Sequence, residues 1–421
     1  MAYIKRDLFE KLKEHLSAKE ISLIIGPRQA GKTTLMKALK DFLDDTGEKT
    51  LFLNLDYEND KRFFSDQDNL IGKIKLELGS AGGYVFIDEM QRKEDAGIFL
   101  KGIYDLGLPY KFIVSGSGSL ELKEKIHESL AGRKRVFELN TVSFKEFADF
   151  KTGYRYKNKL LEFFKVEEKK GELLLEEYLN FGGYPRIVME EKLSEKVKLI
   201  DEIFRSYLER DIAYLLKIEK TEAFSRMIKL LAAQTGNLIN YSEIASNLNI
   251  SVPTLRKYAW YAEKTFVINL LSPFFRNARK EITKSPVAYF SDLGLRNYAL
   301  NIFGHVPENQ IGFLFQNLIA NIAREKLAGL SASLHFWRTK DRAEVDLIIE
   351  QGDKILPIEV KYKHTQGAHI EKSLINFISK YSVEEAWVVN LSFKGERIIG
   401  KSKVRFIPLY EFIGENFNPL Y

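Results

Sequence analysis

Short apolar runs alternate with amphipathic helical patterns over the first part of the chain. Strands are predicted at residues 22–25, 50–55, 84–88, 111–115 and 136–139, and helices at 32–43, 70–78 and 99–106. Buried strands that alternate with helices are typical of a parallel sheet with helices on its faces. The pattern therefore predicts an α/β domain over residues 1–142.

The pattern changes after this domain. Mostly helical periodicity indicates a helical lid region over residues 143–235, opened by a capping box at Ser143 and Glu146. Residues 236–308 contain two short helices joined by a turn, followed by a strand pattern at 266–271. This order is typical of a winged helix-turn-helix.

The last predicted domain, residues 309–421, opens with a long helical pattern at 310–328. Strands are then predicted at 333–337, 344–349 and 355–361, a helix at 369–379 and a strand at 385–390. This order resembles the core of restriction-endonuclease-like nucleases of the PD-(D/E)xK type. The whole chain is thus predicted to be a multidomain α/β protein.

Composition narrows the class of protein. Of the 421 residues, 45% are hydrophobic and 13% aromatic, which is a globular composition. The absence of cysteine excludes disulfides and thiolate metal sites. No apolar run has the length of a membrane span or a secretory signal, so we expect a cytoplasmic protein. The net charge of +6 permits nucleic-acid binding without requiring it.

Residues 26–33, Gly-Pro-Arg-Gln-Ala-Gly-Lys-Thr, match the phosphate-binding loop pattern in full. Gly26 and Gly31 allow the backbone to curl so that successive N–H groups face phosphate oxygens. Lys32 is expected to reach the β- and γ-phosphates, and the hydroxyl of Thr33 to bind Mg²⁺. The predicted ATP-binding residues are Gly26, Pro27, Arg28, Gln29, Ala30, Gly31, Lys32, Thr33, Thr34 and Asp88.

A second half of the same site follows the strand pattern at 84–88. Asp88 and Glu89 come at the carboxyl end of this strand, the edge at which parallel sheets bind ligands. Asp88 is predicted to hold Mg²⁺ together with Thr33, and Glu89 to orient and deprotonate the attacking water. The sequence therefore predicts an ATPase that uses ATP and Mg²⁺.

Further candidates lie later in the α/β domain. Ser115 and Ser117 follow the strand pattern at 111–115, where a hydroxyl could sense the γ-phosphate; a simple Gly/Ser turn is the alternative. Arg133 or Arg135 could act as an arginine finger on the ATP of a neighbouring subunit. Solvated surface arginines are the alternative for this pair.

These motifs together resemble an archaeal and bacterial family of AAA+-like P-loop ATPases. In that family a C-terminal domain of formerly unknown function follows the ATPase. The resemblance implies an ATP-binding ATPase and covers nearly the whole chain. It rests on residues 26–35, 87–91, 115–117, 130–133, 182–185, 207–211 and 289–295.

The helix-turn-helix pattern carries candidate DNA contacts. Thr254, Arg256 and Lys257 are predicted to lie on the exposed face of its second helix, near a DNA groove. Arg279 and Lys280 belong to a basic string that follows and could contact phosphates. The alternative is that the module packs between domains or subunits.

The last domain carries a candidate second metal site. Asp346 and Glu359 are predicted to end adjacent strands and to share a divalent metal, with Lys361 activating water or steadying charge. Nuclease cores of this type commonly add a glutamate from the first helix, where this chain has Gln316. A weakened or inactive nuclease is therefore a full alternative, with the carboxylates paired to Lys361, Arg338 or Arg342.

The main functional hypothesis is an oligomeric, ATP-hydrolysing ATPase that acts on DNA by translocation, remodelling or branched-DNA processing. One alternative is a nucleotide switch of the signalling type that gates protein partners. A second alternative is an ATP-controlled, metal-dependent nuclease, against which the neutral Gln316 argues.

Overall fold

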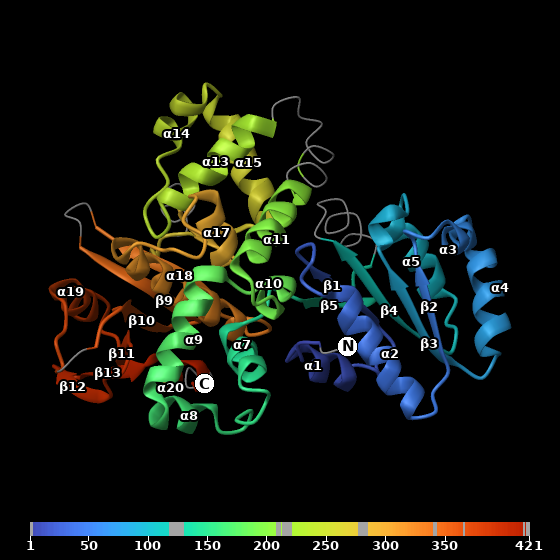
Figure 1. Cartoon of the computed structure of the whole chain (residues 1–421), viewed down its shortest axis with the longest axis horizontal. Coiled ribbons are helices and arrows are strands. Elements are labelled where there is room, and N and C mark those ends of the chain that lie inside the picture. The colour runs from blue at the N-terminus through green and yellow to red at the C-terminus, as the bar shows by residue number, and fades with distance from the viewer. Residues whose placement is uncertain are drawn as a thin grey trace.

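The computed structural model describes residues 3–117, 130–207, 212, 221–276, 285–339, 343–364, 367–415 and 417. The N-terminal α/β core lies at one end of the molecule, and the C-terminal sheet lies at the other (Figure 1). Helices of the middle region lie between and above them. Two candidate DNA residues, Arg279 and Lys280, lie outside the described residues, as does Arg342.

The N-terminal core is a parallel sheet of five strands in the order β2-β3-β4-β1-β5. Its strands are β1 (Ile21–Gly26), β2 (Thr50–Asn54), β3 (Gly83–Asp88), β4 (Tyr110–Ser117) and β5 (Lys134–Glu138). Its helices are α1 (Leu8–Glu14), α2 (Lys32–Asp45), α3 (Glu58–Lys61), α4 (Gln67–Leu78) and α5 (Ala96–Asp105), with short 3₁₀ turns at Arg62–Phe64 and Met90–Arg92.

Side-chain alternation along the strands explains why this sheet is covered on both faces. In β1, Ile21, Leu23 and Ile25 pack with α4 and α5, while Ile24 packs with α1 and α2 on the opposite face. The predicted α/β layering of this region is therefore confirmed. Every predicted strand of the core is present.

The middle region is mainly helical. The Ser143 hydroxyl accepts a hydrogen bond from the Glu146 backbone N–H, and the Glu146 carboxylate accepts one from the Ser143 N–H, so the predicted capping box is formed. The helices are α7 (Phe144–Lys151), α8 (Leu160–Val166), α9 (Glu168–Phe181), α10 (Pro185–Met189), α11 (Leu193–Ser206), α13 (Thr221–Ala233), α14 (Tyr241–Leu248), α15 (Val252–Lys264) and α17 (Leu293–Ala299).

Helices α14 and α15 are joined by a tight turn in which Asn249 takes a left-handed conformation. Ser251 then caps α15 by accepting a hydrogen bond from the Thr254 N–H. Strands β6 (Ile268–Leu271) and β7 (Val287–Phe290) follow as an antiparallel pair. The second strand of this pair was not predicted, because only a four-residue apolar run marks it.

The C-terminal sheet is mixed, with the order β12-β13-β11-β10-β9-β8. Helix α18 (Glu308–Leu327) precedes it. The remaining elements are β8 (Ser333–Arg338), β9 (Glu344–Gln351), β10 (Lys354–Val360), α19 (Lys372–Tyr381), β11 (Glu385–Asn390), β12 (Gly395–Ile399), β13 (Ser402–Pro408) and α20 (Leu409–Gly414).

One apolar core runs through the middle and C-terminal regions. It contains Phe144 of α7, Tyr289 of β7, Phe315 of α18 and Trp387 of β11, all almost fully buried. The segment after β6 also pairs with β8 through Phe274 and Phe336. The domain boundary predicted between residues 308 and 309 thus lies within a shared apolar core. It remains a prediction.

Candidate functional site

The phosphate loop joins β1 to α2 at the carboxyl edge of the first sheet. Gly31 precedes α2 with φ of 94°, a left-handed conformation that favours glycine. No side chain caps the N-terminus of this 14-residue helix. Its first backbone N–H groups have no acceptors within the helix and face an anion site of the kind that binds phosphate. The loop therefore fits a nucleotide phosphate.

Lys32 is buried, with only 6% of its surface exposed. Its ammonium donates hydrogen bonds to the carbonyls of Gly26 (3.0 Å) and Pro27 (2.8 Å). The loop thus holds its own lysine above the strand end, where an incoming phosphate can replace carbonyl contacts. Arg28, Gln29 and Ala30 complete the loop, and Thr34 is exposed on the first turn of α2. 

Asp88 joins the two halves of the site. Its carboxylate, fully buried at the end of β3, accepts hydrogen bonds from the hydroxyls of Thr33 (2.7 Å) and Ser115. A hydroxyl oxygen and a carboxylate oxygen at this separation are the ligand types that Mg²⁺ takes beside nucleotide phosphates. These residues therefore fit the predicted Mg²⁺ site. Ser115 holds Asp88, while Ser117 ends β4 beside Gly26 in the sheet register.

Glu89 follows Asp88 in a left-handed backbone conformation, with φ of 58°. Such a conformation in a residue other than glycine costs on the order of 1–3 kcal/mol and is common at functional sites. Burial, followed by the nearby charge of Asp88, raises the pKa of the Glu89 carboxyl. Its Oε2 accepts a hydrogen bond from the side-chain amide of Gln91. Glu89 thus combines a left-handed backbone with a partly buried carboxyl of raised pKa next to Asp88.

Gly26 has a packing role that the loop motif does not reveal. A Cβ atom at this position would lie 2.0 Å from the carbonyl oxygen of Leu139. The Leu139 N–H donates to the Ile25 carbonyl (2.8 Å), which holds the chain after β5 against the loop. Any side chain at Gly26 would therefore displace this segment.

Arg6 is a site residue that sequence reasoning missed. Its guanidinium donates to the carbonyl of Ala30 in the phosphate loop (2.9 Å) and to that of Asn140 (2.7 Å). It also forms an ion pair of 3.0 Å with Glu146, and both side chains are at least nine-tenths buried. The arginine therefore connects the phosphate loop to α7. No local motif marks it, because its partners lie 24 to 140 residues away.

The segment 182–185, part of the family resemblance, lies against the phosphate loop. The Cγ of Pro185 would lie 3.8 Å from a Cβ at Gly31. The next residue, Arg186, donates to Gln29 of the loop (3.4 Å) and to Glu202 of α11 (3.0 Å). Helix α10 thus brings a cation to the edge of the nucleotide site.

The two candidate finger arginines lie at the opposite end of the sheet. Arg135 pairs with Ser22 in the register of β5 and β1, four residues before Gly26. Arg133 forms an ion pair with Asp105 (2.7 Å). Neither side chain is beside its own phosphate loop, so an arginine-finger role remains a prediction about a neighbouring subunit.

Of the three candidate DNA contacts on α15, two are exposed to solvent and one takes part in the helix cap. Arg256 and Lys257 are exposed, and the Arg256 guanidinium lies 4.2 Å from the ring centre of Tyr241. The hydroxyl of Thr254 is 2.8 Å from that of Ser251, so it takes part in the helix cap. The helix presents two cations on its exposed face.

The candidate second metal site forms where three elements meet. Asp346 is near the start of β9 rather than its end, a correction to the prediction; because β9 and β10 are antiparallel, it still lies beside Glu359. Gln316 of α18 donates its amide N–H to Asp346 Oδ1 (2.7 Å), and Lys361 pairs with Glu359 (2.8 Å). A third carboxylate, Glu371, is 3.4 Å from the same ammonium.

This cluster is short of hydrogen-bond donors. Burial, together with the charge of Glu359, raises the pKa of Asp346, and burial also raises that of Glu359. The Oε2 of Glu359 is buried and has no hydrogen-bond partner among the described residues. An unpaired buried carboxylate oxygen is costly unless a cation or a proton meets it. Two carboxylates with such an oxygen fit a divalent metal.

The described residues contain no helix that is both long and apolar enough to cross a membrane.

Three family models match successive parts of the chain. Residues 18–148 match a model described as an AAA domain. Residues 172–305 and 311–412 match two domains of unknown function, DUF8612 and DUF4143. The first match contains the phosphate loop together with Asp88 and Glu89. This match and the geometry together support a P-loop ATPase core at the N-terminal end of the chain.

Related proteins cover most of the chain. An uncharacterized protein of Mycobacterium tuberculosis is 27% identical over 376 residues, 88% of this chain and 76% of that protein. An uncharacterized protein of Methanocaldococcus jannaschii is 27% identical over 367 residues, 86% of this chain and 78% of that protein. The solved structure of the Aeropyrum pernix Orc1 protein in complex with DNA has a TM-score of 0.31 at 10% identity, covering 72% of this chain and 93% of that one. A likeness at that level does not bear on function.

Proposed function

We propose that the protein is an oligomeric ATPase that hydrolyses ATP to act on DNA. The observation that carries the ATPase part is the contact of Thr33 with Asp88 beneath the phosphate loop, with Glu89 next in the chain. In this proposal Thr33 and Asp88 would hold Mg²⁺, and the ion would offset the negative charge of the nucleotide phosphates. Lys32 neutralises the same phosphates once its carbonyl contacts are exchanged.

Glu89 positions and deprotonates the water that attacks the γ-phosphate. Burial and the charge of Asp88 raise the pKa of the Glu89 carboxyl, which makes it a stronger base than a solvated glutamate. Gln91 orients the carboxylate through its amide. Arg186 connects Gln29 of the loop with Glu202 of α11 and so links the proposed nucleotide site to α10 and α11.

The DNA part of the proposal is supported by the helix-turn-helix of α14 and α15. Its second helix exposes Arg256 and Lys257 without a carboxylate partner among the described residues. Cations on such a helix contact DNA phosphates or base edges. Binding through phosphates would weaken with salt, with a slope that falls by about one for each phosphate contact removed.

The test is the ATPase rate of the wild type with single-stranded, duplex and four-way-junction DNA. We expect at least one DNA to raise the rate, and the Arg256→Ala/Lys257→Ala variant to lose that stimulation while keeping its basal rate. Lys229→Ala, an exposed lysine on the neighbouring α13, serves as the matched control. A basal rate that no DNA alters, but that rises with protein concentration, would instead favour a nucleotide switch that gates self-association or a protein partner.

A second candidate function is a metal-dependent nuclease in the C-terminal sheet. The buried Glu359 Oε2 beside Asp346 supports it, because this oxygen has no hydrogen-bond partner among the described residues and is available to a cation. We expect Mn²⁺-dependent DNA cleavage that Asp346→Ala abolishes while ATP hydrolysis continues. Asp353→Ala, an exposed carboxylate in the turn between β9 and β10, is the control. Equal cleavage by the wild type and Asp346→Ala would assign the cutting to a contaminant.

A further inference from the structure

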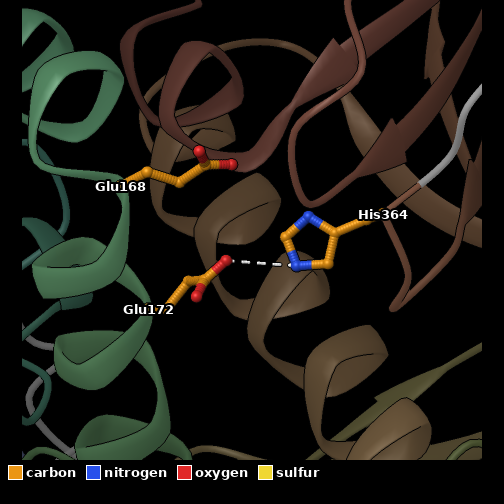
Figure 2. A group of neighbouring side chains, drawn as sticks. All are labelled: Glu168, Glu172 and His364. Atoms are coloured by element: carbon orange, nitrogen blue, oxygen red, sulfur yellow. Dashed lines mark ion pairs between the residues drawn. The ribbon is translucent and has the colours of Figure 1, made fainter.

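A separate group of possible metal ligands lies where α9 meets the C-terminal sheet. Glu168 and Glu172 project from successive turns of α9, and His364 approaches from the segment that follows β10 (Figure 2). Side chains four residues apart lie on the same helix face. One ligand atom from each residue lies within 4.8 Å of those from the other two. The three side chains therefore converge although they come from distant parts of the sequence.

The imidazole of His364 is held in an orientation suited to a metal. Its Nδ1 is 3.0 Å from the hydroxyl of Ser392, and its Nε2 is 3.1 Å from Glu172 Oε1. With the proton on Nδ1, Ser392 accepts it and the Nε2 lone pair faces the carboxylates. Metal-ligating histidines are commonly fixed in this way by a hydrogen bond from the other ring nitrogen.

The spacing of the ligand atoms also fits a small cation. Nitrogen and oxygen ligands bind Zn²⁺ at roughly 2.0–2.2 Å, so two ligands of a tetrahedral ion lie about 3.3 Å apart. The separation of 3.1 Å between His364 Nε2 and Glu172 Oε1 is close to that edge. Two carboxylates and an imidazole form a borderline donor set that suits Zn²⁺ better than Mg²⁺ or Ca²⁺.

The group borders a cavity of about 250 Å³ between α8, α9 and α20. Its wall is apolar on the side of Phe164 and Leu409, and it carries polar groups at the side of the three ligands. An ion with three protein ligands keeps a coordination position for water or a small ligand, which is the arrangement of open zinc sites.

We propose that Glu168, Glu172 and His364 bind a divalent transition metal, with Zn²⁺ the best match. The ion joins α9 to the segment that carries Lys361 of the carboxylate cluster. That segment is already held to the sheet by the hydrogen bond from Lys361 N–H to the Val389 carbonyl (2.8 Å). The metal adds a second attachment on the side of the helical region and fixes the path of residues 361–364.

The experiment is a calorimetric titration of the full-length protein with ZnCl₂ after chelator treatment and without nucleotide. We expect the wild type to bind about one Zn²⁺ at this site, and His364→Ala to lose that equivalent. His369→Ala is the matched control, because His369 is an exposed histidine five residues away. Glu359→Gln identifies any ion that binds to the carboxylate cluster instead.

Ser392→Ala tests the geometry more finely. It keeps all three ligands, so we expect it to retain the site with an affinity about tenfold lower. Co²⁺ in place of Zn²⁺ gives a visible absorption band that should disappear in His364→Ala and persist in Glu359→Gln. A wild type that binds no Zn²⁺, or that binds it as tightly as His364→Ala does, would overturn the proposal and leave the exposed Glu172–His364 ion pair as the whole role of the group.

Discussion

The two halves of the chain each place a buried carboxylate near the end of a strand, but the hydrogen-bond donors around the two carboxylates differ. Asp88 of the ATPase core accepts hydrogen bonds from Thr33 and Ser115, both placed by neighbouring elements. In the C-terminal sheet, Asp346 receives the amide of Gln316 and the Val360 N–H, while one oxygen of its neighbour receives nothing.

The two arrangements differ in kind. The contacts around Asp88 suit a ligand that binds and dissociates, whereas one carboxylate oxygen of the second site lacks a donor among the described residues. Because the hydroxyls of Thr33 and Ser115 donate to Asp88, this carboxylate is hydrogen-bonded without nucleotide. Under the proposed function, Mg²⁺ would enter by displacing the Thr33 contact. Where Glu359 Oε2 has no donor, the fold keeps an energetic cost that only a cation or a proton removes. Burial raises the pKa of both carboxyls in that second site, and the charge of Glu359 raises that of Asp346 further.

The largest effect is expected at Glu89, the proposed general base of the core. Glu89→Gln keeps the shape and the contact with Gln91 but removes the charge that accepts a proton. We expect kcat for ATP hydrolysis to fall about 10²–10⁴-fold with ATP binding retained. Steady-state turnover and nucleotide titration measure the two quantities. Glu94→Gln, an exposed neighbour, controls for the loss of charge. A fall below tenfold would remove Glu89 from the reaction.

The core site was predictable because its chemistry is contiguous. The loop motif is eight consecutive residues, and Asp88 and Glu89 follow one apolar strand. Only the pairing of strands β1, β3 and β4 had to be inferred. The carboxylate cluster was predicted from spacing and resemblance, and Gln316 does lie against Asp346 as expected. The lack of a described hydrogen-bond donor to Glu359 Oε2 was not predictable, because it depends on which side chains the packing keeps away from the cluster.

A smaller effect is expected at Arg6, which connects the core to α7. Arg6→Ala removes the hydrogen bond to the Ala30 carbonyl and leaves the Glu146 carboxylate buried without its cation. We expect kcat/KM for ATP to fall about tenfold, because one charge-assisted hydrogen bond contributes roughly 1.5–3 kcal/mol. Lys11→Ala, on the exposed face of α1, is the control.

The double variant Arg6→Ala/Glu146→Gln separates two explanations of that loss. If Arg6 acts by positioning the loop, the double variant stays as slow as the single one while its stability recovers. If the loss comes only from the unpaired carboxylate, turnover recovers with stability. Thermal unfolding and kcat/KM, measured on the wild type, both single variants (Arg6→Ala and Glu146→Gln) and the double variant, give the coupling energy.

Asp292 is an intermediate case between the two regions. Its buried carboxylate accepts hydrogen bonds from the N–H groups of Gly183 (2.8 Å) and Leu295 (2.9 Å). Burial nevertheless raises the pKa of this carboxyl to about 6. A raised pKa means that the folded state binds more protons than the unfolded state, so stability falls as the pH rises from about 4 through 6. The contribution of Asp292 to this change in the free energy of unfolding is at most roughly 3 kcal/mol.

We therefore expect Asp292→Asn to be less stable than the wild type at pH 4 and to lose less stability between pH 4 and pH 6.5. Urea unfolding at several pH values measures both. Asp353→Asn, exposed in the turn after β9, should follow the wild-type slope. Parallel slopes for the wild type and Asp292→Asn would mean that the two N–H donors outweigh burial at this site.

Two strands and one residue that the sequence did not reveal were missed for separate physical reasons. Strand β12 is largely exposed at the sheet edge, so its residues lack the apolar alternation that marks a half-buried strand. Strand β7 is fully buried, but its four residues are too few to separate a strand from a loop. Arg6 was missed for the complementary reason that a polar residue near the N-terminus carries no sign of its distant partners.

The smallest effect on ATP turnover is expected from Gln316→Glu. This change replaces the amide donor to Asp346 with a third carboxylate, so like charges meet in a buried site. Without metal the variant should unfold more easily than the wild type, by about 1–3 kcal/mol. Mn²⁺ should restore that loss and stabilise the variant more than it stabilises the wild type, because a bound ion adds its binding free energy to the folded state.

ATP hydrolysis by Gln316→Glu should stay near the wild-type rate, because no described contact joins Gln316 to the phosphate loop. Gln310→Glu, two turns earlier on α18 and bonded to Arg296, is the matched substitution. If Mn²⁺ stabilises Gln316→Glu no more than Gln310→Glu, the cluster is a structural pair held by Lys361. If it stabilises Gln316→Glu selectively, the single amide at position 316 is what limits the metal affinity of the C-terminal sheet.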